Sequence, residues 1–255
     1  MASPTDIPNL VLWFRASDLS AYADGTAMDN QWSSVVGSST TTQITTASQP
    51  TKQTVGADSV VRFDGTDDWL RITTGAALTA TQNKAAVTIF AKAKVNTIPA
   101  ATGLFFFFST AASTTSRCQV GIAATTGVGR IGGRRLDADA LQSFSGTLAW
   151  DTTDVHVQTS VYDWANASAY IYLDGALSGS NTAFQTAGNS DTTASGAAAM
   201  GAANSATSLQ LACDLYDVIV YDRVLTSGEQ QTVEDYLLGI SSEPPNVIVE
   251  LIRSQ

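Results

Sequence analysis

Short runs in which apolar and polar residues alternate limit most strongly what this chain can fold into. The clearest runs are 87–95, 155–162 and 169–173, where apolar residues or threonine occupy almost every second position. Because successive side chains of a β-strand point to opposite faces of its sheet, runs of this length and period predict strands. Small polar residues bound the runs, as expected where a chain turns. Further strands are predicted at 10–14, 60–63, 69–72, 104–108, 119–123 and 215–221.

Many short strands with small polar connections predict an all-β fold of two packed sheets. The chain has 255 residues, 44% of them hydrophobic, which is enough for one large core. Two stretches, 38–48 and 189–208, are poor in bulky residues and are predicted to be long surface loops. The residues expected inside the core include Val157, Ile171, Leu173 and Ile219.

One helix is marked at both ends. Thr226 to Glu229 reads Thr-Ser-Gly-Glu, a capping box in which hydroxyl and carboxylate satisfy each other's backbone amides. Gly239 can supply the left-handed residue that ends the helix. Between them, Val233 and Leu237 share a face at helical spacing. We expect this short helix to lie across one end of the sandwich.

Residues 1–240 form the predicted sandwich domain, and residues 241–255 form a separate tail. Pro244 and Pro245 prevent the helix from continuing, and a mostly apolar run follows. A solvated strand with two apolar faces invites aggregation, so this segment is predicted to be covered. It either crosses back onto its own sandwich or adds a strand to a neighbouring protein, and we favour the second alternative. The predicted assembly strand contains Val247, Ile248, Val249, Leu251 and Ile252.

Three passages resemble parts of laminin G-like jelly rolls, which belong to the concanavalin A-like lectin/glucanase superfamily. Residues 60–70 are similar to their strand–turn–strand with an aromatic-Asp-Gly turn, and residues 156–175 to their paired central strands ending in a Tyr-x-Asp-Gly turn. Residues 214–237 are similar to their closing strand and helix. The resemblance implies an all-β, two-sheet antiparallel jelly-roll sandwich with one short C-terminal helix. This fold hosts lectins, glycanases, adhesion modules and virion proteins, so it leaves the function open.

Catalytic residues are not predicted. Glycanases of this superfamily use closely spaced acidic residues on one strand, and a retaining mechanism needs two carboxyl groups about 5 Å apart. The four glutamates all lie in or after the predicted helix. Asp214 and Asp217 are three positions apart, which points them to opposite faces of a strand unless a bulge intervenes. His156 has no nucleophile elbow to serve and is predicted to be a packed or surface histidine.

Asp64, Asp67 and Asp68 are the candidate metal ligands. The resemblance implies calcium, because laminin G-like domains often hold this ion at the rim of the sandwich, where carboxylate oxygens suit it. The alternative is that Asp64 accepts backbone hydrogen bonds within a turn and that Asp67 is solvated. We favour the turn, so no cofactor is predicted.

Trp69 and Trp164 are the candidates for binding a glycan, because an aromatic ring can stack on the apolar face of a sugar. Large aromatic side chains of a sandwich also pack in its core or at its rim, and we favour this alternative for both.

The charge excludes two classes of partner. A formal net charge of -10 repels phosphate groups, so nucleic acids and anionic membranes are not expected as partners. Membrane insertion is not expected either, because no run approaches the roughly 18 apolar residues of a membrane span. The N-terminus lacks the pattern of a secretory signal. Together with a Ser-, Thr-, Ala- and Gly-rich and Lys-poor composition, this favours a bacteriophage virion protein, such as a fibre, spike, collar or capsid decoration. Its expected partners are other virion proteins, further copies of itself in a homo-oligomer, or a cell-surface glycan. The alternative is an extracellular bacterial carbohydrate-binding, lectin-like module.

Overall fold

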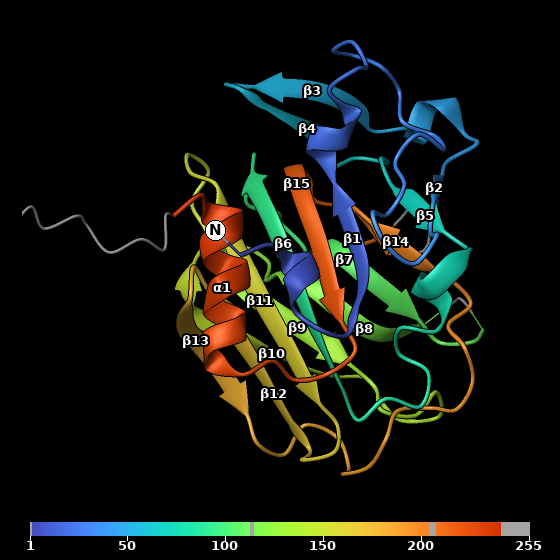
Figure 1. Ribbon diagram of the computed structural model, residues 1–255, viewed down its shortest axis with the longest axis vertical. Helices are drawn as coiled ribbons and strands as arrows, with labels where there is room; N and C mark the ends of the chain where they lie inside the picture. The colour runs from blue at the N-terminus through green and yellow to red at the C-terminus, as the bar shows by residue number, and fades with distance from the viewer. Residues whose placement is uncertain (1, 113–114, 204–207, 241–255) are drawn as a thin grey trace, which may run out of the picture.

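The computed structural model describes residues 2–112, 115–203 and 208–240 (Figure 1). Its strands form two antiparallel sheets that pack face to face, which confirms the predicted fold class. We call the sheet beside the helix the helix-side sheet and the other the opposite sheet. In the helix-side sheet the order is β13-β12-β11-β6-β15-β4-β3, and β1 pairs with β15 beside β4. In the opposite sheet the order is β10-β9-β8-β7-β14-β5-β2.

The strands and helices have the following residue bounds. The helix-side sheet contains β1 (Leu10–Arg15), β3 (Thr51–Val55), β4 (Asp58–Asp64), β6 (Ala86–Val95), β11 (His156–Asp163), β12 (Ser168–Leu173), β13 (Ala176–Asn181) and β15 (Ala212–Tyr221). The opposite sheet contains β2 (Thr41–Thr42), β5 (Leu70–Ile72), β7 (Gly103–Ser109), β8 (Ser116–Ile122), β9 (Val128–Gly133), β10 (Gln142–Ala149) and β14 (Ala198–Met200). The helices are α1 (Ser227–Leu238) and the short 3-10 turns η1 (Pro4–Asp6), η2 (Ala16–Leu19), η3 (Thr46–Ser48) and η4 (Gly75–Leu78).

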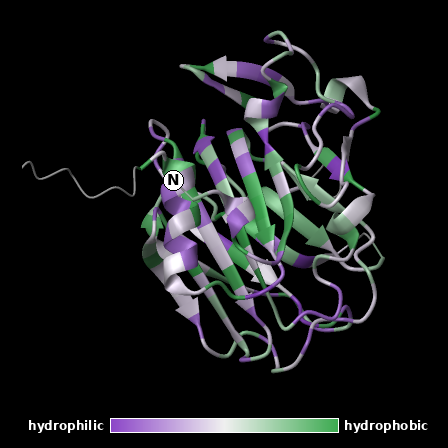
Figure 2. Cartoon of the chain, in the orientation of Figure 1, coloured by the Kyte–Doolittle hydropathy of each residue, from purple (hydrophilic) through white to green (hydrophobic). Residues whose placement is uncertain are grey.

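Helix α1 has the predicted capping residues, but it does not lie across one end of the sandwich as predicted. The Thr226 hydroxyl accepts from the Glu229 amide, the Glu229 carboxylate accepts from the Thr226 amide, and Gly239 is left-handed at φ 70°. The helix does not close an end of the sandwich. It lies along the outer face of the helix-side sheet (Figure 1), where Val233 and Leu237 pack on apolar strand residues. Figure 2 shows hydrophobic residues in green along β1 and β15. On the outer face, Trp13, Phe90, Val157 and Ile219 form one apolar cluster with Val233 and Leu237 of the helix.

The four predicted core residues are all buried, but they lie on two faces. Ile171 and Leu173 are in the main core between the sheets. Val157 and Ile219 are in a second cluster under α1, on the outer face. A single interior was therefore the wrong expectation, because the helix turns the outer face of the sheet into a second core.

The nine strands predicted within the described residues are confirmed, but both predicted loops contain a short strand. The run 38–48 contains β2, which pairs with β5. The run 189–208 was expected to be a surface loop, yet it contains β14, which pairs with β5 and β7 in the middle of the opposite sheet. Its residues Ala198, Ala199 and Met200 are fully buried. The sequence did not predict this strand, because its alanines are small and lack the bulk by which the other strands were recognised. The predicted assembly strand at 247–252 lies outside the described residues and stays a prediction.

Candidate functional site

A broad hollow surface lies at the rim of the sandwich, where the β4–β5 turn, the β6–β7 connection and the start of β15 meet. Two adjoining hollows of about 460 and 660 Å³ share Asp64, Thr97 and Ala212. We call them together the rim cleft. Its polar lining includes Gln49, Thr51, Arg62, Asp64, Asp68 and Asn96, and its apolar lining includes Ile98, Pro99 and Leu209.

Two residues that line the rim cleft, Arg62 and Asn96, belong to a hydrogen-bonded cluster around the buried carboxylate of Asp214. Arg62 on β4 lies opposite Asp214 on β15 in the strand register. Its Nε and Nη2 donate to the two Asp214 oxygens at 2.6 and 2.8 Å, and Asn96 Nδ2 donates to Oδ1 at 3.2 Å. Asp214 is 1% exposed, whereas the Arg62 side chain is 43% exposed. Because a two-pronged ion pair fixes the plane of a guanidinium, the exposed part of Arg62 is held rigidly toward the cleft.

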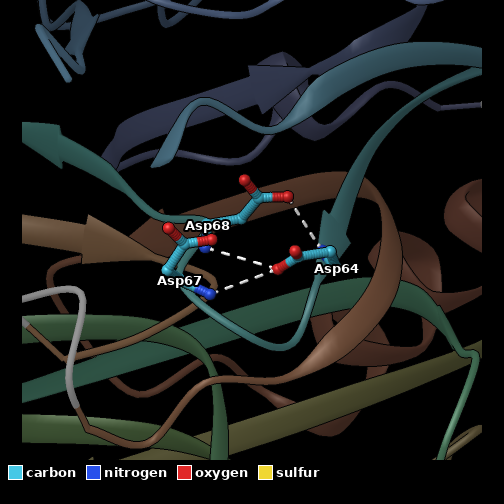
Figure 3. Close-up of side chains that lie close together, drawn as sticks. All are labelled: Asp64, Asp67 and Asp68. Atoms are coloured by element: carbon cyan, nitrogen blue, oxygen red, sulfur yellow. Dashed lines mark hydrogen bonds between the residues drawn. The ribbon is translucent and has the colours of Figure 1, made fainter. Parts of the chain in front are cut away.

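The three candidate metal ligands form the turn at the edge of this cleft (Figure 3). Asp64 Oδ1 accepts from the backbone amides of Thr66, Asp67 and Asp68 at 2.7, 3.3 and 3.4 Å. Asp68 Oδ2 in turn accepts from the Asp64 amide at 2.9 Å. These bonds are those of an aspartate-stabilised turn, the favoured interpretation of this motif.

The same hydrogen bonds limit what the three carboxylates offer to a cation. One oxygen from each can come within 4.8 Å of the others. One oxygen of Asp64 and one of Asp68 already accept backbone amides, and Ca²⁺ needs six to eight oxygen ligands. The turn geometry thus explains the cluster without an ion.

Asp68 is the most perturbed acid of the cleft. Burial raises its pKa to about 6, the Asp64 amide opposes this, and the neighbouring charges of Asp64 and Asp67 add to it. This carboxyl group therefore takes up its proton as the pH falls through about 6, well above the range of an ordinary aspartate.

The predicted glycan-stacking tryptophans do not line the rim cleft. Trp164 is completely buried in the main core beside Tyr162, at 5.9 Å between ring centres, so it offers no face to a sugar. This removes Trp164 as a candidate. Trp69 is partly buried and packs against Leu104, Phe107 and Ala199 on the opposite sheet. Rim packing explains its position.

His156 lies elsewhere on the rim. Its Nδ1 is 2.6 Å from Asp174 Oδ2 and its Nε2 is 3.3 Å from Asp151 Oδ2. Burial lowers the pKa of His156, but the two carboxylates outweigh burial and raise it. No serine hydroxyl among the described residues is hydrogen-bonded to the ring, so this is an ion-paired surface histidine, as expected.

A β-bulge changes the expected geometry of Asp214 and Asp217. The register of β15 against β6 shifts between Leu215 and Asp217, so the extra residue is Tyr216. Asp214 pairs with Lys94 and Asp217 with Lys92, and alternate residues of β6 share a face. Both aspartates therefore lie on the outer face, as the sequence allowed only with a bulge. Arg62 and Asn96 cover Asp214, however, and keep it from a substrate.

Arg62 and Asn96 were missed by sequence reasoning. Neither residue belongs to a motif, and Arg62 is 152 positions from Asp214. Only the strand register brings them together. A charged residue inside an apolar strand, as in Val-Val-Arg-Phe, was the one available signal.

No protein-family model matches this chain, and no curated protein matches its sequence. Solved structures are similar in fold. A sialidase of Trypanosoma rangeli is 14% identical with a TM-score of 0.61, and the match covers 93% of this chain and 34% of the sialidase. The CBM40 of the Ruminococcus gnavus IT-sialidase, bound to α2,3-sialyllactose, is 15% identical with a TM-score of 0.53, over 72% of this chain and 96% of that one.

A third neighbour is botulinum neurotoxin type C, whose cell entry depends on interaction with two ganglioside molecules. It is 10% identical with a TM-score of 0.59, over 92% of this chain and 53% of the toxin chain. At these identities the likeness shows the fold alone, that of a lectin-like β-sandwich. This chain spans about a third of the sialidase that it matches. In the described part of the chain, no helix has the length and apolar character needed to cross a membrane.

Proposed function

We propose that this chain is a non-catalytic glycan-binding module and that the rim cleft holds its ligand. The observation that carries the proposal is the Arg62–Asp214–Asn96 cluster, which fixes two of the side chains that line the cleft. Sugars present many hydroxyl groups, and rigid planar donors and acceptors bind them with little loss of side-chain entropy. The Arg62 Nη1 group donates to none of the described residues and is therefore available to a ligand.

The cleft also supplies the other contacts that a sugar needs. Asp68 and Gln49 line the same hollow as Arg62 and offer acceptors, and Ile98 and Pro99 add apolar surface to the adjoining hollow. The two hollows together extend beyond the size of a single ring, which favours an oligosaccharide. Two of the structural neighbours, the sialyllactose-bound module and the ganglioside-dependent toxin, support the same class of ligand by analogy of fold.

The absence of catalysis is part of the proposal. A retaining glycanase needs an accessible pair of carboxyl groups about 5 Å apart. Asp214 is covered by Arg62 and Asn96, and Glu229 and Glu234 are committed to contacts made by α1. Asp217 then stands on the outer face without an accessible carboxylate partner on its strand.

The role in a bacteriophage virion stays a prediction, as do virion-protein partners, a homo-oligomer and the location of the protein. The structural neighbours favour the carbohydrate-binding alternative, since their names concern sialidases, a binding module and a toxin. A glycan-binding module on a particle would use the same cleft to attach to a host. Flanking tail or capsid genes would support the virion, and flanking polysaccharide-degradation genes would support the alternative.

The test is a glycan array probed with the labelled full chain, followed by titration of the best ligand. Arg62→Lys keeps a cation beside Asp214 but loses the fork, so we expect at least about tenfold weaker binding at an unchanged melting temperature. Gln49→Ala should also weaken binding, whereas the exposed Gln231→Ala on α1 is the matched control. Ligand recovered afterwards should be uncleaved. Full affinity in both cleft variants, or no bound glycan, would reject the rim cleft as the site.

A further inference from the structure

The bulge at Tyr216 opens a second, smaller pocket on the outer face of the helix-side sheet. The pocket has a volume of about 190 Å³ and lies where the C-terminal half of α1 leaves the sheet uncovered. We call it the bulge pocket. Bulges re-aim side chains and often lie next to functional sites. The residues that matter in it are Arg15, Asp58, Lys92, Tyr216, Asp217 and Tyr236.

A carboxyl group stands at the base of the bulge pocket. Trp13 Nε1 donates to Asp217 Oδ1 at 2.9 Å, and Trp13 is 2% exposed. The other oxygen, Oδ2, accepts no hydrogen bond from the described residues. Asp217 Oδ2 is not among the buried polar atoms that lack a partner, so water or a ligand hydroxyl can reach it and supply a hydrogen bond.

A lysine beside this carboxyl group also lacks a hydrogen-bond partner. Lys92 is the direct cross-strand neighbour of Asp217, and its Nζ lies 5.2 Å from the centre of the Tyr216 ring. In the described part of the chain it donates to no acceptor, whereas Lys52 and Lys84 are paired with Asp24 and Asp222 at 2.7 Å. Three N–H donors therefore face the pocket next to one free carboxylate oxygen.

Aromatic side chains surround these two groups. The Tyr236 ring from α1 meets the Trp13 ring edge to face, with 5.6 Å between the centres. Arg15 lies over the Trp13 ring at 4.8 Å, and its Nε and Nη2 are held by Asp18 at 2.8 and 2.6 Å. Arg15 thus supports the wall, while Lys92 and Asp217 keep donors and an acceptor available.

We propose that the bulge pocket binds the two adjacent hydroxyl groups of one uncharged sugar ring. One hydroxyl would donate to Asp217 and the next would accept from Lys92, and the ring would rest beside Tyr216 or Tyr236. The pocket is smaller than a drug-sized site and fits one ring. It is a site separate from the rim cleft and does not depend on the function proposed for that cleft.

The charges of the pocket favour a neutral ligand over an acidic one. Lys92 and Arg15 bring two positive charges from β6 and β1, and Asp18, Asp58 and Asp217 bring three carboxyl groups from η2, β4 and β15. The whole chain has a net charge of -10. A ligand carboxylate would therefore meet little net attraction.

Binding should weaken in acid. Burial raises the pKa of Asp217 to about 6, against the hydrogen bond from Trp13 and the charges of Lys92 and Arg15; the charge of Asp18 raises it further. Tyr236 on α1 and Asp58 on β4 face the same pocket. A protonated Asp217 is a weaker acceptor, so affinity should fall below about pH 6.

The experiment is an NMR titration of the full chain with methyl glycosides of glucose, galactose, mannose and fucose. Tetrahydropyran-2-methanol, which has the ring without adjacent ring hydroxyls, is the ligand control. At least one glycoside should bind saturably at pH 7.5, and the control compound should not. Asp217→Asn and Lys92→Met should each weaken that binding about tenfold or more, since hydrogen bonds to charged groups are the stronger class. Lys94→Met, on the same strand and face, is the matched protein control.

The outcomes separate this proposal from that for the rim cleft. Loss of binding in Asp217→Asn and Lys92→Met, with retention in Arg62→Lys and Lys94→Met, would support the bulge pocket. Binding that is lost only in Arg62→Lys would assign the sugar to the rim cleft and overturn this inference. Absence of saturable binding by all four glycosides would also overturn it. Because Asn can still accept from Trp13 and Met keeps the Lys92 stem, melting curves should show that both variants fold.

Discussion

The two faces of the helix-side sheet differ in polarity, and the difference is the opposite of what their positions lead one to expect. The inner face of β11, which meets the opposite sheet, contains Gln158, Ser160 and Tyr162, opposite Leu173, Ile171 and Ala169 of β12. The outer face carries Val157 and, on β15, Ile219, and both are buried under α1. The more polar side of β11 is therefore the one between the sheets. Alternation reveals that a strand has two faces, but not which of them lies inside.

The inner face accepts polar side chains because the opposite sheet provides space and acceptors. The Tyr162 hydroxyl donates to the Gln119 carbonyl at 2.6 Å, and Gln158 Nε2 donates to the Arg130 carbonyl at 3.4 Å. Gly129 and Gly133 on β9 face these side chains. A Cβ atom added to Gly129 would lie 2.9 Å from Gln158 Oε1, and one added to Gly133 would lie 3.0 Å from the Tyr162 ring.

The largest effect should come from placing a charge on the inner face. Ile171→Asp buries an unpaired carboxylate in the main core, which costs far more than the few kcal/mol that a domain can lose. We expect no soluble folded protein. Leu177→Asp, on the neighbouring strand β13 at a position that is 56% exposed, should fold normally. A folded Ile171→Asp protein with the wild-type melting curve would contradict the inner face assigned to β12.

A smaller effect should come from filling the space that Gln158 uses. The added methyl group of Gly129→Ala would also lie 3.1 Å from Ile171 Cγ2, so we expect a loss of about 1–3 kcal/mol in unfolding free energy. Gln158→Ala in the same chain should recover part of this loss, because it removes the closest atom. Denaturant unfolding of the two single variants and the double variant measures the coupling. Purely additive losses would show that Gly129 does not accommodate Gln158.

The sequence predicted nine of the fifteen strands in the described residues and missed β2, β3, β9, β10, β13 and β14. Alternation and turn residues located most strands and the capped helix, because these depend on local chemistry. The place of α1, the second core and the strand β14 depend on contacts between distant segments. The candidate site divides in the same way. The Asp64 turn is local and was predicted, whereas Arg62 and Asp214 meet only through the register of β4 and β15.

Lowering the pH should stabilise the fold, because one aspartate on the outer face and one at the rim have raised pKa values. Burial raises the pKa of Asp217 on the outer face and of Asp68 at the rim to about 6, from 3.8 for an ordinary aspartate. The folded state then binds more protons than the unfolded state between about pH 4 and 6, so these groups destabilise the fold as the pH rises. The raised pKa of His156 also makes the fold less stable as the pH rises near neutrality. Protonated His156 stabilises the folded state, and this stabilisation is lost when the ring loses its proton.

We therefore expect the protein to gain about 1–3 kcal/mol of stability between pH 8 and pH 5, seen as a higher melting temperature. Asp217→Asn and Asp68→Asn should each reduce this gain. Two acids with lowered pKa values affect stability only at lower pH. The backbone amides of Asp137 and Thr193 lower the pKa of Asp191 to about 2, and Arg223 lowers that of Glu229 to about 2. Their stabilisation is lost only below about pH 4. A melting temperature that falls between pH 8 and pH 5 would contradict the buried, raised acids.

The smallest effect is expected from a calcium chelator, which should leave the stability of the protein unchanged. In the turn interpretation Asp64 Oδ1 holds three backbone amides and Asp67 contributes only a 3.4 Å contact from Ser48 Oγ. A chelator should then leave the melting temperature unchanged, Asp67→Ala should be nearly silent, and Asp64→Ala should cost about 1–2 kcal/mol with or without calcium. An ion held by the three carboxylates would instead stabilise the fold by mass action. A melting temperature that a chelator lowers, calcium restores and Asp67→Ala makes insensitive to both would establish a metal site at this turn.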